Sequence, residues 1–136
     1  MAPQAMDGTP AAAGLLAGRL LLALIFVHEG WSIIGKYSGA VAYMEKFGVP
    51  GMLLPAVIGL ELGGGLLIAI GALTWLIAPM FAVFCMLTAV VFHMQFADGN
   101  QLLHFQKDLA IAGGFLVLAV SGPGKWSADW RVRIRS

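Results

Sequence analysis

Charged residues are scarce in this sequence. Of its 136 residues, 11% are charged and 60% are hydrophobic, and the formal net charge is +1. A soluble domain carries about 25% charged residues, so neither a water-facing surface nor a disordered chain is expected. A nucleic-acid partner is not expected either, because phosphate binding requires a basic patch. The composition therefore predicts an integral membrane protein whose main surroundings are the lipid bilayer.

Cysteine is almost absent, since Cys85 is the only one. A single thiol forms no internal disulfide, and no Cys-x-x-Cys pair suggests zinc binding or thiol exchange. Cys85 lies in an apolar run, where a free cysteine usually packs as a small hydrophobe. Spacings such as His-x-x-x-His and Glu-x-x-His are also missing, so no metal site is predicted.

Long apolar runs dominate what remains, at residues 12–34, 52–73, 76–96 and 103–120. About 20 apolar residues suffice to cross a bilayer, and lipid leaves an open backbone no alternative to the helix. The alternating segments of about ten residues that build a membrane barrel are absent. The sequence predicts an all-α, integral membrane four-helix bundle. Without a repeat or linker, residues 1–136 are expected to form a single domain.

The basic tail predicts the orientation of these spans. Four crossings place both termini on one side, and the tail holds four basic residues and one acidic residue: Lys125, Arg131, Arg133, Arg135 and Asp129. By the positive-inside rule that side is cytoplasmic. Residues 36–51 and 97–102 then face outward. Within the first outer loop, residues 40–47 are expected to form a short helix that lies at the level of the headgroups.

Two charged residues lie deep in the apolar runs. Arg19 is about 10 Å from the cytoplasmic end of the first span, and Glu61 is about 14 Å from the outer end of the second. A lone charge at such depth costs roughly 2.5–3.5 kcal/mol, so a partner is expected. The long arginine side chain can bridge the remaining gap. An Arg19–Glu61 ion pair is predicted, either as a structural link between helices or as a polar centre that changes protonation.

The outer ends of the spans collect the other titratable side chains. This predicted outer cluster contains all three histidines and three further groups: His28, Glu29, His93, His104, Lys107 and Asp108. One interpretation is a set of interfacial polar groups that bind each other or water. The other is a shared pocket for a quinone-like or other small polar molecule, because histidine and carboxylate neighbours suit proton-coupled redox chemistry at neutral pH.

Three motifs resemble the DoxX family of small inner-membrane proteins. They are the run Arg19–Phe26 with His28, Gly30 and Lys36; the run Glu61–Leu67 with Gly71; and Asn100–Gln101 with His104–Phe105, Lys107–Gly114 and Gly122–Gly124. The resemblance covers residues 14–127. It implies a membrane oxidoreductase or a membrane subunit of a redox complex, acting on quinone-like or small sulfur substrates, in a family linked to redox stress.

The resemblance also implies which polar positions recur in the family, namely Arg19, His28, Lys36, Glu61, His104 and Lys107. Two positions depart from its pattern. Asp108 replaces the usual asparagine after Lys107, and Ile33-Ile34 separate the histidine-glycine region from Lys36.

Three functional hypotheses follow. The first is an oxidoreductase component that binds a quinone at the outer cluster. The second is a noncatalytic anchor that assembles soluble redox enzymes, which the absence of nucleotide and haem motifs favours. The third, a proton-coupled carrier, would be expected to show an inverted repeat, and none is found. Redox protein partners or a homo-oligomer are compatible with the first two.

Overall fold

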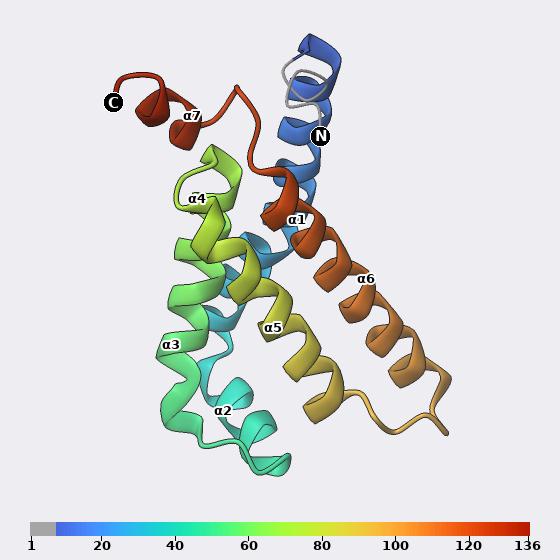
Figure 1. Ribbon diagram of the computed structural model, residues 1–136. Helices are drawn as coiled ribbons and strands as arrows, with labels where there is room; N and C mark the ends of the chain where they lie inside the picture. Colours follow the sequence, from blue (N-terminus) through green and yellow to red (C-terminus); the bar gives the residue numbers. More distant parts are fainter. Residues whose placement is uncertain (1–7) are drawn as a thin grey trace.

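Residues 8–136 are described by a computed structural model, and every regular element in this range is helical. Four stretches are long and apolar enough to cross a membrane: Thr9–Gly35, Gly51–Ile70, Thr74–Phe92 and Gly99–Ser121. The first is α1, the third is α5 and the fourth is α6 (Figure 1). The second consists of a short 3-10 turn at Gly51–Leu53, α3 at Leu54–Ile58, a π-helical segment at Gly59–Gly64 and α4 at Gly65–Ile70. The predicted all-α membrane fold is confirmed.

Two ends of the bundle are distinguished below. The tail end holds the start of α1, the turn between α4 and α5, and residues 122–136, which include α7 at Ala128–Arg133. The loop end holds α2 at Tyr37–Lys46 and the turn between α5 and α6 (Figure 1). The predicted short helix is therefore present as α2, whereas α7 was not predicted.

Local signals explain where the spans differ from their predicted bounds. The second ends at Ile70 rather than at residue 73, because Gly71 and Leu73 adopt positive φ values of 70° and 52°. At the loop end, the Asp98 carboxylate accepts a hydrogen bond from the backbone N–H of Asn100 at 2.9 Å. This cap starts α6 at Gly99, so residues 99–102 of the predicted outer loop are helical.

One hydrophobic core joins all four spans, and three phenylalanine rings lie at its centre. Phe26 of α1 lies 4.3 Å from Phe81 of α5 between ring centroids, and Phe81 lies 4.9 Å from Phe115 of α6. Ile68 of α4 is fully buried in the same cluster. Close approach of the helices depends on Gly30 and Gly65, where an added Cβ would lie within 3.0 Å of atoms on the facing helix. The core thus fixes the depth of each helix relative to its neighbours.

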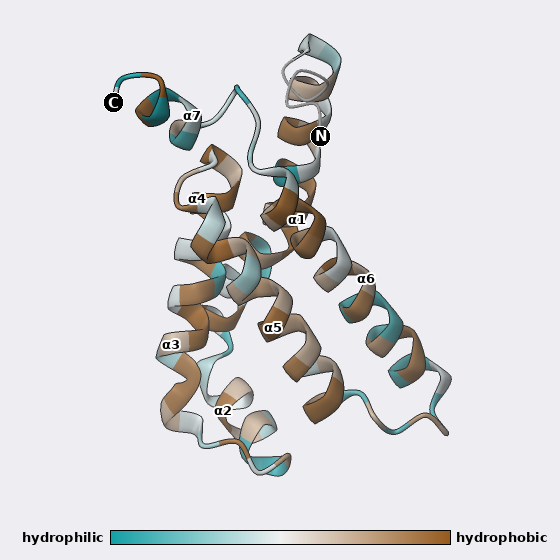
Figure 2. Cartoon of the chain, viewed as in Figure 1, coloured by the Kyte–Doolittle hydropathy of each residue, from teal (hydrophilic) through white to brown (hydrophobic). Residues whose placement is uncertain are grey.

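The outer faces of the spans are apolar, and Figure 2 shows hydrophobic residues along all four. Large side chains such as Trp31, Leu21 and Val120 are more than 70% exposed in the isolated chain. Burial of these faces against lipid, rather than against protein, accounts for the exposure. The hydrophilic residues gather in α7, at the loop end and along the first half of α6.

Candidate functional site

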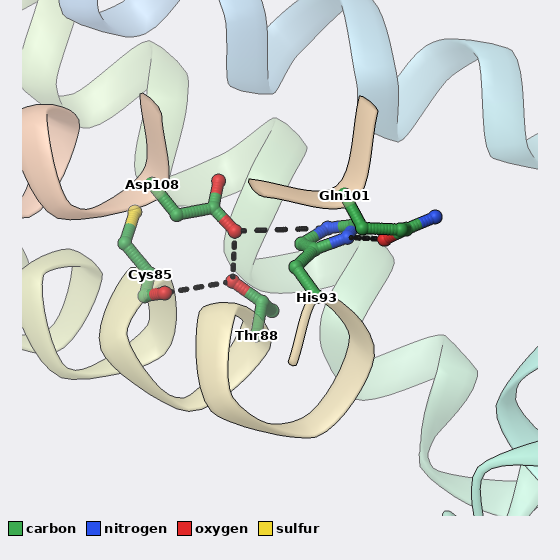
Figure 3. Close-up of polar contacts among 5 residues, drawn as sticks. All are labelled: Cys85, Thr88, His93, Gln101 and Asp108. Atoms are coloured by element: carbon green, nitrogen blue, oxygen red, sulfur yellow. Dashed lines mark hydrogen bonds and ion pairs between the residues drawn. The ribbon is translucent and has the colours of Figure 1, made fainter. Parts of the chain in front are cut away.

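Four polar side chains meet at the loop end where α5 passes into α6. We call His93, Gln101, His104 and Asp108 the loop-end polar group. Because α5 ends at Phe92 and α6 begins at Gly99, the chain reverses within six residues and returns the first turns of α6 to the end of α5. Figure 3 shows His93 between Gln101 and Asp108, with Thr88 of α5 beneath them.

The two ring nitrogens of His93 have different partners. Nδ1 lies 2.7 Å from Oε1 of Gln101, which accepts only, so Nδ1 is assigned as the protonated nitrogen. Nε2 lies 3.8 Å from Oδ2 of Asp108, at ion-pair distance but beyond a direct hydrogen bond. In the neutral ring, Nε2 and Oδ2 are two acceptors that face each other. A proton that binds to Nε2 or to Oδ2 therefore has the other acceptor atom close by.

The hydroxyl of Thr88 can serve Asp108 in both of its protonation states. Its Oγ1 lies 2.9 Å from the carbonyl oxygen of Cys85 and 3.2 Å from Oδ2 of Asp108. Since a hydroxyl carries one hydrogen, it donates to only one of these oxygens at a time. When it donates to Cys85, its lone pairs can accept from a protonated Asp108. A Thr88–Asp108 hydrogen bond can thus form in either protonation state of Asp108.

His104 is the exposed member of the group. Its ring stacks on that of His93 with centroids 5.2 Å apart and an angle of 27° between the planes. His93 and Asp108 keep only 19% and 23% of their side-chain surface exposed, so His104 presents the group to the surroundings. Phe105, the residue after His104 in α6, packs edge to face with Phe96 of the preceding turn, with ring centroids 5.1 Å apart.

The other members of the predicted outer cluster stay apart from this group. His28 and Glu29 of α1 pair with each other, with 3.4 Å between Nδ1 and Oε1, and their side chains are 73% and 54% exposed. Within the described residues, neither forms a hydrogen bond or ion pair with the loop-end polar group. Lys107 is exposed on α6. Of the six predicted residues, the structure therefore brings His93, His104 and Asp108 into one group and leaves His28 and Glu29 as a separate pair.

The predicted Arg19–Glu61 ion pair is not formed. Across the interface with α1, the position of Gly30 faces Glu61, and the position of Gly71 faces the guanidinium of Arg19. Arg19 and Gly30 are eleven residues apart in α1. At about 1.5 Å per residue, the two charged groups lie at levels roughly 16 Å apart along the bundle. Counting depth from the ends of apolar runs missed this offset, because the runs do not end at one level: Arg19, ten residues after the start of α1 at Thr9, lies beside Gly71, just after the second span ends at Ile70.

Arg19 binds backbone at the tail end instead. Its Nη1 donates to the carbonyl oxygen of Pro123, and its Nη2 donates to that of Trp126 at 2.8 Å. The side chain is 1% exposed, and the helix end and chain reversal after α6 form its surroundings. Two charge-assisted hydrogen bonds to carbonyls offset part of the cost of burying the guanidinium. Arg19 therefore fixes the segment that leads to α7.

Glu61 lies in the π-helical segment and is 7% exposed. Its Oε2 has no hydrogen-bond partner among the described residues. A π-helical turn is uncommon and is often found at functional sites. The structure thus separates two residues that sequence reasoning had paired, and it leaves the carboxyl group of Glu61 inside the bundle.

Sequence reasoning missed Thr88 and Gln101 as members of the polar surroundings. Gln101 lies in the predicted outer loop at residues 97–102, although it shares a helical face with His104 and Asp108 at i, i+3 and i+7. That spacing could have revealed it. Thr88 lies in the apolar run of α5, and only the packing of α5 against α6 brings its hydroxyl to Asp108.

The fold and this site define a four-span helical membrane protein with a histidine–carboxylate pair near one end. A family model described as DoxX matches residues 14–94, which is more than half of the chain. The chain belongs to the DoxX family, as its motifs predicted.

Two proteins of Escherichia coli (strain K12) are similar to this chain. Inner membrane protein YqjF is 50% identical over 116 residues, covering 85% of this chain and 89% of that protein. Inner membrane protein YphA is 36% identical over 124 residues, covering 86% and 89% respectively. No solved structure matches the chain.

Proposed function

We propose that the protein is a membrane component of a bacterial redox system that binds a quinone-like molecule at the loop-end polar group. The observation that carries this proposal is the His93–Asp108 pair, whose hydrogen bonds accommodate either protonation state. Reduction of a quinone to a quinol takes up two electrons and two protons. A pair of this kind, with exposed His104 stacked on it, provides a place where protons are exchanged with a bound carbonyl.

The electrons are assigned to a partner protein. The chain has one cysteine and no nucleotide-binding or haem motif, so its own residues supply proton exchange and binding. A redox protein with a reduced flavin or metal centre would act as the electron donor. The noncatalytic anchor hypothesis differs from this proposal in one respect, because an anchor would bind the partner protein but no quinone.

The location of the site follows from the relatives and the tail. The two relatives described above are named as inner membrane proteins, and we assign the same membrane to this chain. The basic residues of the tail support a cytoplasmic tail end, with the loop-end polar group near the outer face. Quinones partition within the bilayer and would reach the group laterally, past Phe96 and Phe105.

Quinone binding by the purified protein tests the proposal. Protein reconstituted in lipid nanodiscs is titrated with a short-chain ubiquinone analogue, and the affinity is followed by quenching of intrinsic tryptophan fluorescence. We expect saturable binding that His104→Ala and Gln101→Ala each weaken at least fivefold. That factor corresponds to losing one hydrogen bond of about 1 kcal/mol.

Gln106→Ala is the matched control for Gln101→Ala, because Gln106 is an exposed glutamine of α6 outside the group. Its affinity should equal that of the unchanged protein. Absence of saturable quinone binding by the unchanged protein would overturn the proposal and favour an anchor. Equal weakening by Gln101→Ala and Gln106→Ala would place the site elsewhere.

A further inference from the structure

The tail end carries positive charge that the described part of the chain does not neutralise. Residues 122–136 hold four basic side chains and one acid, Asp129. The Asp129 carboxylate accepts hydrogen bonds from the backbone N–H groups of Leu73 at 2.8 Å and Thr74 at 2.9 Å. It therefore caps the start of α5. Within residues 8–136, no ion pair involves any of the four basic side chains: Lys125, Arg131, Arg133 and Arg135.

A groove of about 570 Å³ lies beside this charge, between the start of α5, the end of α6 and one face of α7. Its walls are mainly apolar and include Leu73, Trp75, Ala119 and Val132, and two charged residues, Arg133 and Asp129, also line it. Trp75 and Val132 are 71% and 69% exposed. Tryptophan is enriched at the level of lipid headgroups, so the groove has the character of a membrane–water interface.

Backbone contacts hold the walls of the groove in place. The N–H of Asp129 donates to the carbonyl oxygen of Gly71 at 2.9 Å, which attaches α7 to the turn between α4 and α5. Arg19 attaches the preceding segment through its bonds to Pro123 and Trp126. The space between α7 and the spans is therefore defined before any ligand enters, which lowers the entropic cost of binding.

We propose that this groove binds one anionic phospholipid, with an acyl chain against its apolar walls and the phosphate on Arg133. Charge complementarity favours an anionic headgroup, because the four basic side chains of the tail outnumber Asp129, the acid that lines the groove and accepts its hydrogen bonds from the start of α5. The apolar walls select an acyl chain, which a free phosphate lacks. This proposal is independent of the redox function, because it involves the opposite end of the bundle from the loop-end polar group (Figure 1).

Native mass spectrometry of protein released from nanodiscs tests the site. Nanodiscs contain either phosphatidylcholine alone or phosphatidylcholine with a minority of phosphatidylglycerol, and the number of retained lipids is counted. We expect the unchanged protein to retain one phosphatidylglycerol in preference to phosphatidylcholine. Arg133→Gln should lower this retention about fivefold, the factor that one basic side chain contributes near an anionic lipid. Arg135→Gln is the matched control, because Arg135 belongs to the tail but not to the groove, and should retain the lipid.

A second variant separates the groove from the charge. Ala119→Trp fills the groove and leaves every charge in place, so it should also abolish the preference for phosphatidylglycerol. Ala128→Leu, on the α7 wall, replaces it if circular dichroism shows that Ala119→Trp does not fold. Glycerol 3-phosphate should not displace the lipid, because it lacks an acyl chain.

Four outcomes would overturn the proposal. Equal loss in Arg133→Gln and Arg135→Gln would indicate diffuse attraction to the membrane surface. Retention that is unchanged in the folded groove-filling variant would place the lipid elsewhere. Displacement by glycerol 3-phosphate would indicate a site for the headgroup alone. A dimer that retains no lipid would assign the groove to a second copy of the chain.

Discussion

At the tail end of the bundle, Arg19 and Asp129 bind backbone groups, whereas at the loop end His93 and Asp108 face each other. The backbone partners of Arg19 are carbonyl oxygens and those of Asp129 are amide N–H groups, and neither kind changes its charge. The loop-end partners are a second titratable group, an amide side chain and a hydroxyl that can reverse its role. A charged side chain whose partners are backbone groups therefore fixes the fold, whereas one whose partners can change their hydrogen-bonding role is suited to proton exchange.

The largest effect is expected from removing the charge at the tail end. Arg19→Met leaves the carbonyl groups of Pro123 and Trp126 without their donors, and should lower the free energy of unfolding by about 3 kcal/mol. SDS titration in mixed micelles measures it. The quinone affinity of the folded fraction should be unchanged. If stability is kept but quinone binding is lost, the tail end participates in the chemistry and the contrast between the ends is wrong.

The next effect is expected at Gly71, in the turn that receives Arg19. Its φ is 70°, and an added Cβ would lie 2.5 Å from Nη1 of Arg19. Gly71→Ala should cost about 2 kcal/mol in the same titration, from backbone strain and displacement of the guanidinium. Gly63→Ala is the matched control, because Gly63 is helical and has no neighbouring atom within 4 Å of the added Cβ. Equal losses in both would contradict a specific role for the Arg19 contacts.

A smaller loss of stability is expected when the helix caps at the two ends of the bundle are removed. Asp129 accepts from two amides at the start of α5, and Asp98 accepts from one at the start of α6. We expect Asp129→Ala to lower the free energy of unfolding by about 2 kcal/mol and Asp98→Ala by about 1 kcal/mol. Hydrogen exchange of the first turns of α5 and α6 shows which helix start is released. A larger loss from Asp98→Ala would reverse the assignment of the tail end as the more firmly fastened one.

The smallest effect on stability is expected at Glu61. Because it does not pair with Arg19, Glu61→Gln removes a buried carboxyl without breaking an ion pair, and the melting temperature should stay constant or rise. Glu29→Gln, at an exposed position on the facing helix, is the control. A loss of about 3–5 kcal/mol in Glu61→Gln alone would show that Glu61 has a charged partner after all.

Sequence reasoning predicted the class of fold well and the contacts of the site only in part. The apolar runs predicted the four spans, and the residues before Gly48-Val49-Pro50 predicted the short helix α2. The motifs predicted the DoxX family. Helix bounds differ where φ values or a side-chain cap decide them, as at Gly71 and Asp98. Of six predicted outer-cluster residues, the structure joins His93, His104 and Asp108, because the tight turn between α5 and α6 brings their helix ends together.

Four membrane crossings follow from the amino-acid sequence alone, because apolar length and scarce charge leave lipid as the only suitable environment. The sequence also identifies side chains that are expensive to bury, Arg19 and Glu61 among them. Their partners, in contrast, depend on how the helices pack. Close packing through Gly30 and Gly65 sets the relative depth of α1 and the second span, so Arg19 meets the backbone after α6 and Glu61 does not meet Arg19. Depth between helices depends on such contacts, which no single span encodes.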